Sequence, residues 1–221
     1  MDIALFDLDH TLIPFDSGAV FTRHLAERGA LPPEFEAQYL EYCLRYAAGT
    51  VDMVQMHRFT VGALAVHDPA TLARWLDEFR HLVAPRIPQR ARQLVQQHQA
   101  AGHACALVTA TTRFVAEAFG AVLDLREVLA TQPEVGPDGR YTGEIVGHAC
   151  FREHKLVHVR AWLARRGLAW GDVGRSWFYS DSCNDLPLLQ AVTDPVAVDP
   201  DARLHAFATA RGWPVLSLRE P

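Results

Sequence analysis

The chain has 221 residues, of which 49% are hydrophobic and 21% charged, so apolar side chains suffice to fill the core of an ordinary globular protein. Its 21 basic and 26 acidic residues give a formal net charge of −5, which argues against a nucleic-acid partner. With no run of about 18 apolar residues, we also expect no membrane partner. An acidic start without a basic and apolar leader, and four cysteines without CxxC spacing, predict a cytoplasmic protein with reduced thiols.

Three short apolar runs are typical of strands buried on both faces of a parallel sheet, and polar residues follow each of them. These runs are residues 3–6, 104–108 and 177–179. Helical patterns are found at residues 88–101, 112–123 and 153–166, and Gly102 and Gly167 are placed to end two of these helices. Strands that alternate with helices predict a doubly wound α/β core with a Rossmann-like parallel sheet.

Two segments depart from this alternation. Residues 15–85 have helical patterns and no convincing buried strand, and Asp68 followed by Pro69 predicts the start of one helix. We therefore predict a helical cap at 15–85, inserted into a core made of residues 1–14 and 86–221. Residues 134–146 contain Pro-Asp-Gly between short apolar segments, a pattern that predicts a β-hairpin.

Carboxylates follow the first predicted strand immediately. If strand geometry continues past the strand, Asp7 and Asp9 point the same way at the edge where parallel sheets bind ligands. Like charges there repel each other unless a cation lies between them, and oxygen ligands favour a hard ion such as Mg²⁺. One carboxylate could attack a substrate while its neighbour transfers protons. An aspartate-rich turn without catalytic function would look the same.

Three further groups complete the candidate site. Thr109 follows the second predicted strand, Lys155 lies near the start of a predicted helix, and Asp181 and Asp185 follow the third strand, with Asn184 beside Asp185. Each has a structural alternative: an N-cap threonine, an exposed helical lysine, and an aspartate that caps the helix beginning near residue 186.

Taken together, the order of these residues closely resembles that of the haloacid dehalogenase superfamily, in particular its phosphoserine-phosphatase-like branch, which includes histidinol-phosphatase-like members. Residues 7–11 match the motif DxDx[TV], although His10 stands where glycine is most frequent. The strand that ends at Thr109, the lysine at 155 and the acidic pair at 181 and 185 match the remaining motifs.

The resemblance implies a phosphatase that works through an aspartyl-phosphate, because the second aspartate is absent from the dehalogenases. Asp7 is then the nucleophile and Asp9 the general acid and base. The Asp7 side chain, the Asp9 carbonyl and Asp181 would hold Mg²⁺, and Asp185 would support these ligands without contacting the metal. The groups that bind phosphoryl oxygens are then Thr109, Ala110, Lys155 and Asn184.

The same resemblance implies that the cap selects a small phosphate monoester. Asp16 lies where the phosphoserine phosphatases carry an acidic residue for the substrate ammonium. Thr60 lies at the place of their carboxylate-binding arginine, although Arg58 could serve if the helix is rotated. An ammonium site without a carboxylate site suits an amino-alcohol phosphate, so L-histidinol phosphate is the first candidate and phosphoserine the second. We interpret His57 as a histidine on a helix surface rather than in the site.

Two other classes of protein share part of this pattern. A phosphorylatable receiver also uses an aspartate, a Ser or Thr and a lysine around a parallel sheet, but Asp9 and the acidic pair argue against it. A binding protein that has lost catalysis would be expected to lack at least one of these groups. His154 and His158 have the i, i+4 spacing of a zinc-binding pair, but the sequence offers no third ligand, so we do not predict a zinc site there.

Overall fold

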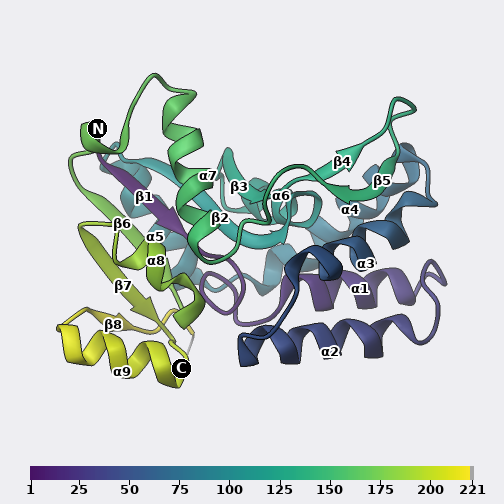
Figure 1. The fold of residues 1–221 in the computed structure, drawn as a ribbon, viewed down its shortest axis with the longest axis horizontal. Coiled ribbons are helices and arrows are strands. Elements are labelled where there is room, and N and C mark those ends of the chain that lie inside the picture. Colours follow the sequence, from purple (N-terminus) through teal and green to yellow (C-terminus); the bar gives the residue numbers. More distant parts are fainter. Residues whose placement is uncertain (220–221) are drawn as a thin grey trace.

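A computed structural model describes residues 1–219, so residues 220–221 of the predicted core lie outside the described part of the chain. Its main sheet is parallel throughout, with the strand order β3-β2-β1-β6-β7-β8 (Figure 1). The strands are β1 (Ile3–Phe6), β2 (Ala104–Thr112), β3 (Glu127–Thr131), β6 (Ser176–Ser180), β7 (Asp194–Val198) and β8 (Val215–Leu216). This arrangement confirms the predicted parallel α/β core.

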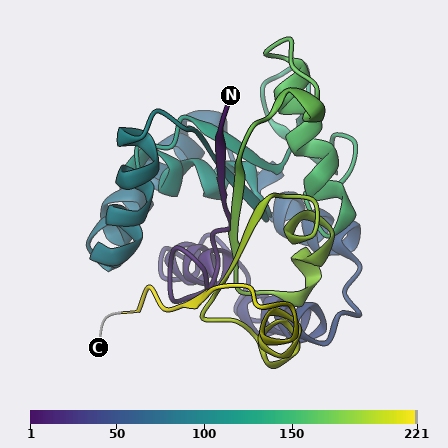
Figure 2. The same cartoon turned by 90° about the vertical axis from the view of Figure 1, so that its left-hand side faces the viewer.

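Helices cover both faces of the sheet, as the edge-on view in Figure 2 shows. Along β1 the side chains alternate: Ala4 and Phe6 belong to one buried cluster, and Ile3 and Leu5 belong to the other. The first cluster includes side chains from α5 (Gln89–Ala100) and α6 (Arg113–Val122). The second includes side chains from α7 (Glu153–Ala164), α8 (Leu186–Leu189) and α9 (Ala202–Arg211).

Four helices lie beside the sheet at its carboxyl edge, and we call them the cap helices. They are α1 (Ser17–Ala26), α2 (Phe35–Ala48), α3 (Met53–Ala65) and α4 (Pro69–Val83). Asp68 caps α4 by accepting a hydrogen bond from the Thr71 amide at 2.9 Å, and Pro69 is its first residue, as predicted.

The predicted hairpin also forms, from β4 (Pro133–Val135) and β5 (Tyr141–Ile145), and β5 packs against α3. Gly143 of β5 faces Gly62 of α3, and its φ of +92° is a conformation that glycine adopts more readily than other residues.

The boundaries of the elements differ from the predictions in small ways. The strand predicted at 104–108 continues to Thr112, because Thr112 pairs with Thr131 of the unpredicted neighbour β3. The helix predicted at 153–166 ends at Ala164, and Gly167 follows with a φ of +72°. Strands β7 and β8 and helix α9 were also not predicted.

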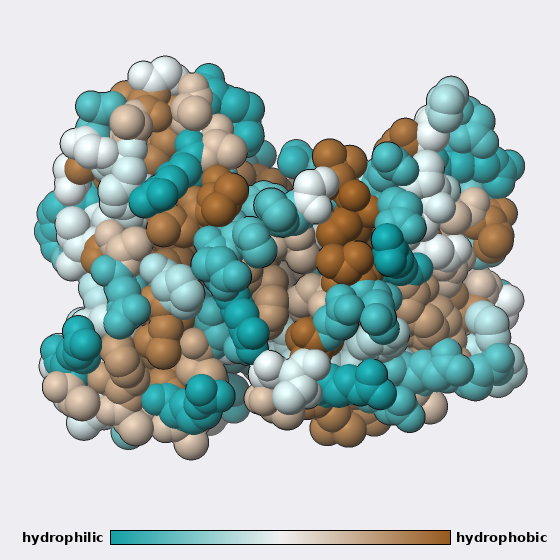
Figure 3. Space-filling view, viewed as in Figure 1, coloured by the Kyte–Doolittle hydropathy of each residue, from teal (hydrophilic) through white to brown (hydrophobic). Residues whose placement is uncertain are grey.

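Figure 3 shows both polar and apolar side chains on this face of the molecule, with some of the apolar ones at its lower edge, where α2 lies. Leu40 and Leu44 of that helix are exposed, whereas Phe35 and Tyr39 on its other side are buried. Within residues 1–219, no helix combines the length and hydrophobicity needed to cross a membrane.

The packing of α6 against β3 predicts the effect of one substitution. Gly120→Ala would place a Cβ 2.8 Å from a Val128 methyl group and 3.0 Å from the Leu125 carbonyl oxygen. We expect the free energy of unfolding to fall by about 1–3 kcal/mol. Gly62→Ala in α3 is the control, because its Cβ meets nothing within 4 Å, and it should stabilise the protein by roughly 0.5–1 kcal/mol. Urea denaturation measures both, and a Gly120→Ala protein as stable as the wild type would contradict this packing.

Candidate active site

The candidate site lies where the chain order of the sheet reverses. β1 pairs with β2 on one side and with β6 on the other, so Asp7 and Asp181 leave neighbouring strands at the same edge. Such a reversal opens a crevice at the carboxyl ends of the strands, where open parallel sheets bind ligands. Thr109 lies within the continuation of β2 on the other side of β1.

A buried lysine joins two of the acidic groups. Lys155 Nζ donates hydrogen bonds to Asp7 Oδ1 at 2.9 Å and to Asp185 Oδ2 at 2.7 Å. The side chains of Lys155 and Asp185 are both fully buried, and Ser180 Oγ donates a further bond to Asp185 Oδ2 at 2.7 Å. Asp185 directly precedes α8 but makes no side-chain cap bond there. Its capping alternative is therefore wrong, and so is the exposed-lysine alternative for residue 155.

Thr11 is an unpredicted partner of Asp181. Its hydroxyl donates to Asp181 Oδ1 at 2.9 Å and accepts from the Asp181 amide at 3.0 Å. This reciprocal pair connects the segment after β1 to the segment after β6. It orients the Asp181 carboxylate, because both the side chain and the backbone of that residue are bound to one hydroxyl.

The carboxylate of Asp9 is held separately from that of Asp7. The Ser17 amide donates to Asp9 Oδ1 and the Thr111 hydroxyl donates to Asp9 Oδ2, each at 2.6 Å. Ser17 begins α1, so the positive end of a helix dipole faces this carboxylate. Neither bond was predicted. His10, next to it, has a φ of +59°, which accounts for the preference for glycine at this place in the motif.

Burial raises the pKa values of Asp7, Asp9 and Asp181 above the ordinary value of an aspartate. The pKa of Asp7 rises to about 7, mainly through burial and against the opposing charge of Lys155. The pKa of Asp9 rises to about 6, through burial and then the charge of Asp16. Burial and the charge of Asp7 raise the pKa of Asp181 well above its usual range. The pKa of Lys155 is raised because Asp185 and Asp7 more than offset its burial.

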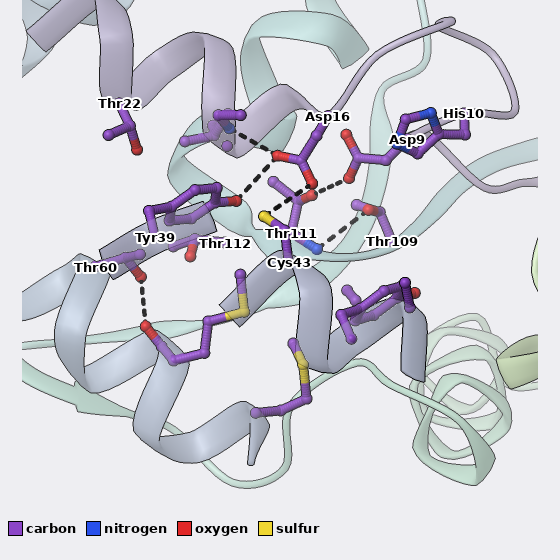
Figure 4. Close-up of a pocket in the computed structure, with 18 of the residues that line it drawn as sticks. Asp9, His10, Asp16, Thr22, Tyr39, Cys43, Thr60, Thr109, Thr111 and Thr112 are labelled. Atoms are coloured by element: carbon purple, nitrogen blue, oxygen red, sulfur yellow. Dashed lines mark hydrogen bonds between the residues drawn. The ribbon is translucent and has the colours of Figure 1, made fainter. Parts of the chain in front are cut away.

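A cavity of about 590 Å³ connects this cluster with the cap helices. The core side of its wall includes Asp7, Asp9, Thr109, Ala110, Asp181 and Asn184, and the cap side includes residues of α1, α2 and α3. Figure 4 shows Asp9 beside Asp16, with Thr109 and Thr111 next to Asp9 and with Tyr39 and Cys43 next to Asp16. The structure thus brings most of the predicted site residues around one cavity, with Lys155 and Asp185 buried directly behind Asp7.

Asp16 is firmly positioned in the wall of this cavity. Its Oδ1 accepts hydrogen bonds from the Ala19 amide at 2.7 Å and the Tyr39 hydroxyl at 3.0 Å, and the Cys43 thiol lies 3.8 Å from Oδ2. Gly18 permits the tyrosine contact, because a Cβ there would lie 1.9 Å from the Tyr39 hydroxyl oxygen. The bonds to Oδ1 leave Oδ2 with room to accept from a ligand.

Two expectations about α3 are wrong. The side chain of Arg58 is half exposed and forms an ion pair with Glu144 at 2.8 Å, and Arg58 does not line the cavity, whereas Thr60 does. His57, interpreted as a surface histidine, is buried and lines the cavity. Its Nδ1 lies 3.0 Å from the Thr112 hydroxyl, and burial lowers its pKa to about 4. The helix therefore turns residues 57 and 60 inward and residue 58 outward.

The chemistry of the donors fits the predicted magnesium site. Among residues 1–219, no three His, Cys, Asp or Glu side chains gather into a metal site of their own. The predicted set needs only two carboxylates, of Asp7 and Asp181, with the Asp9 carbonyl, which suits an ion that keeps several waters. Asp185 Oδ1 is buried without a hydrogen-bond partner among the described residues, and the pKa of Asp181 is raised first by burial and then by the charge of Asp7. Both features indicate more negative charge than Lys155 neutralises.

Comparisons with known proteins identify the family of this chain. Residues 4–190 match the family model of the haloacid dehalogenase-like hydrolases. The chain belongs to this family. Its membership confirms the resemblance seen in the sequence and identifies the protein as a hydrolase with the family's parallel sheet.

Related chains are similar to this one over nearly its whole length. A protein of Neisseria meningitidis named histidinol-phosphatase is 38% identical over 99% of both chains. A Mycobacterium tuberculosis protein named phosphoserine phosphatase SerB1 is 32% identical over 98% of this chain and 70% of its own length.

Solved structures show the same haloacid dehalogenase-like fold. A Bordetella pertussis Tohama I protein of unknown function, 45% identical, covers 99% of both chains with a TM-score of 0.91. A substrate-bound phosphoserine phosphatase, 15% identical, covers 99% of this chain and 93% of its own with a TM-score of 0.68.

The raised pKa of Asp9 predicts how one substitution depends on pH. A carboxyl whose pKa is higher in the folded chain than in the unfolded chain is favoured when protonated, so its ionisation lowers stability as pH rises through about 6. Asp9→Asn cannot ionise, so the variant should gain free energy of unfolding relative to the wild type as pH rises from about 4 to about 6, and the difference should level off above that pH. Urea denaturation of both proteins in EDTA measures this difference. The histidines are the same in both proteins, so their contribution to the pH dependence of stability cancels. A difference that does not change with pH would contradict the prediction.

Proposed function

We propose that the protein is a Mg²⁺-dependent phosphomonoesterase that acts through an aspartyl-phosphate on Asp7, with L-histidinol phosphate as its substrate. The observation that carries the proposal is that the carboxylates of two neighbouring aspartates are held by different partners. Asp7 is held by Lys155 at the edge of the sheet, whereas Asp9 is held by Ser17 and Thr111 beside the cavity. One carboxylate is thus placed for attack and the other for proton transfer.

The first half-reaction follows from these contacts. Lys155 binds Asp7 Oδ1, so we assign attack on phosphorus to Oδ2, which forms a bond to phosphorus as the ester P–O bond breaks. Asp9 gives its proton to the departing alcohol oxygen. Its pKa of about 6 means that it is protonated more often than an exposed aspartate at the same pH. Thr109, the Ala110 backbone, Lys155 and Asn184 are assigned to the phosphoryl oxygens.

In the second half-reaction, ionised Asp9 takes a proton from a water molecule. The water oxygen attacks phosphorus, the bond to Asp7 breaks, and inorganic phosphate leaves with Asp7 regenerated. Mg²⁺, held by the Asp7 and Asp181 carboxylates and the Asp9 carbonyl, would supply positive charge that neutralises the phosphate dianion among these aspartates.

We assign residues 15–85 to a cap that selects the alcohol. Asp16 Oδ2 is placed to receive an ammonium group, and Phe35, Tyr39, Met53 and Met56 supply an apolar and aromatic wall suited to an unsaturated ring. Among the described residues that line the cavity, Arg203 of α9 is the only lysine or arginine. The cap side therefore has no cation for a substrate carboxylate, which favours an amino-alcohol phosphate. Phosphoserine is the alternative, with Arg203 then serving its carboxylate.

A receiver or a silent binding protein fits these observations less well. A receiver keeps its aspartyl-phosphate, whereas Asp9 is bound next to the cavity as a base for hydrolysis. The large cavity between the cap helices and the core also provides space for a substrate. A receiver has no small-molecule substrate and needs no such cavity. Turnover distinguishes the three classes.

The substrate proposal predicts the outcome of a direct comparison. Phosphate release from L-histidinol phosphate and L-phosphoserine is measured side by side, with Mg²⁺ and with EDTA. We expect a higher kcat/KM for histidinol phosphate with Mg²⁺, no turnover with EDTA, and no turnover by Asp7→Asn, which keeps the fold. A preference for phosphoserine would overturn the substrate assignment, and full activity in EDTA or in Asp7→Asn would overturn the mechanism.

The ammonium role of Asp16 predicts an increase in KM. Asp16→Asn keeps an acceptor for the Ala19 amide and for Tyr39 but removes the charge. We expect the KM for histidinol phosphate to rise about tenfold or more, with little change for an analogue that lacks the amine. Arg58→Ala is the control and should leave both values unchanged, because Arg58 pairs with Glu144 outside the cavity. An equal loss on both substrates would refute the ammonium site.

A further inference from the structure

Arg152 has a backbone conformation that arginine rarely adopts. Its φ is +51° and its ψ −128°, a combination that glycine reaches freely and that crowds any residue with a Cβ. It directly precedes α7, three residues before Lys155. A glycine at this position would relieve the strain, so the presence of arginine indicates that its side chain has a role.

The guanidinium of Arg152 bridges the core and the cap helices. Nη2 donates to the Gly49 carbonyl at 2.7 Å, just past the end of α2, and Nε donates to Asn184 Oδ1 at 3.3 Å. Asn184 Nδ2 in turn donates to the Tyr46 carbonyl at 3.5 Å. Two carbonyls at the carboxyl end of α2, the negative end of its dipole, are thus bound by these two core residues.

These bonds also determine the orientation of the Asn184 amide. With Oδ1 accepting from Arg152 and one N–H directed to Tyr46, the remaining N–H is the group that the amide can offer to a ligand. Asn184 and Tyr46 both line the main cavity, whereas Arg152 lines a smaller neighbouring cavity of about 340 Å³ and does not reach the main one. Any effect of Arg152 on the site therefore passes through Asn184 and α2.

We propose that Arg152 is a positioning residue that orients Asn184 toward the phosphoryl group and holds the carboxyl end of α2 over the cavity. The proposal rests on the phosphatase function, because it gives Asn184 a phosphoryl oxygen to bind. This role explains why a strained arginine occupies a position suited to glycine. Its side chain contacts both Asn184 and the carboxyl end of α2, which a glycine at this position could not do.

The test combines Arg152→Gly with Asn184→Ala in a double-mutant cycle. Each single variant should lower kcat/KM about tenfold. The loss in the double variant should be clearly smaller than the product of the two single losses, because part of the effect of Arg152 passes through Asn184. Losses that multiply, or a wild-type kcat/KM in Arg152→Gly, would overturn the proposal.

The melting temperature separates positioning from a general structural role. Arg152→Gly relieves backbone strain, so its melting temperature should be at or above that of the wild type while its activity falls. A melting temperature that falls with the activity would assign Arg152 a structural role and overturn the proposal. The matched control is Asp124→Gly, an exposed residue with a φ of +53° that lines neither cavity; it should gain stability and keep its kcat/KM.

Hydrogen exchange tests the contact with α2 without any turnover. The Gly49 and Thr50 amides, which are bonded to the Tyr46 and Arg45 carbonyls, should exchange faster in Arg152→Gly than in the wild type, and at the wild-type rate in Asp124→Gly. Unchanged exchange in Arg152→Gly would overturn the contact. If the wild type hydrolysed no phosphate monoester, the phosphatase function would fail by itself, and hydrogen exchange would still decide whether Arg152 holds α2.

Discussion

The buried ion pairs of Lys155 hold the site together. One ammonium group, without exposure to solvent, contacts carboxylates that come from the end of β1 and from the segment after β6. Burying these charges is costly, and removing one partner of such a group typically costs about 3–5 kcal/mol because the other charge is left unpaired. The lysine therefore aligns α7 with two neighbouring strands, and it holds Asp7 by one oxygen while the other remains free.

Lys155 does not neutralise all the negative charge that the site gathers. Asp7, Asp9 and Asp181 are all buried enough that their pKa values rise, and Asp16 adds a further charge next to Asp9. A phosphate dianion could approach this group only with added positive charge, which is the physical reason for assigning a divalent cation. Under the proposed function, the core would carry out phosphoryl transfer. The cap helices, together with Asp16 at the N-terminus of α1, would select the alcohol.

The sequence was sufficient to predict the three central strands β2, β1 and β6 and the polar residues that follow them, because both are local patterns. Continuous apolar runs indicate strands buried on both faces, and parallel strands bring the residues after them to one edge. The partners of these residues were not predictable in the same way. Thr11 meets Asp181 across 170 positions of sequence, and Tyr39 reaches Asp16 only because α2 packs beside α1. Arg58 was misplaced because two positions on a helix differ by about 200°, so Thr60 faces the cavity and Arg58 faces Glu144.

The most direct measurement of the mechanism is mass spectrometry of the enzyme quenched in acid during turnover of L-histidinol phosphate with Mg²⁺. If Asp7 is the nucleophile, a peptide that contains residues 3–9 will carry the mass of one phosphoryl group, located on Asp7, and Asp7→Asn will carry none. Turnover without a phosphorylated peptide, or a phosphoryl group located on another residue, would contradict the assignment of Asp7.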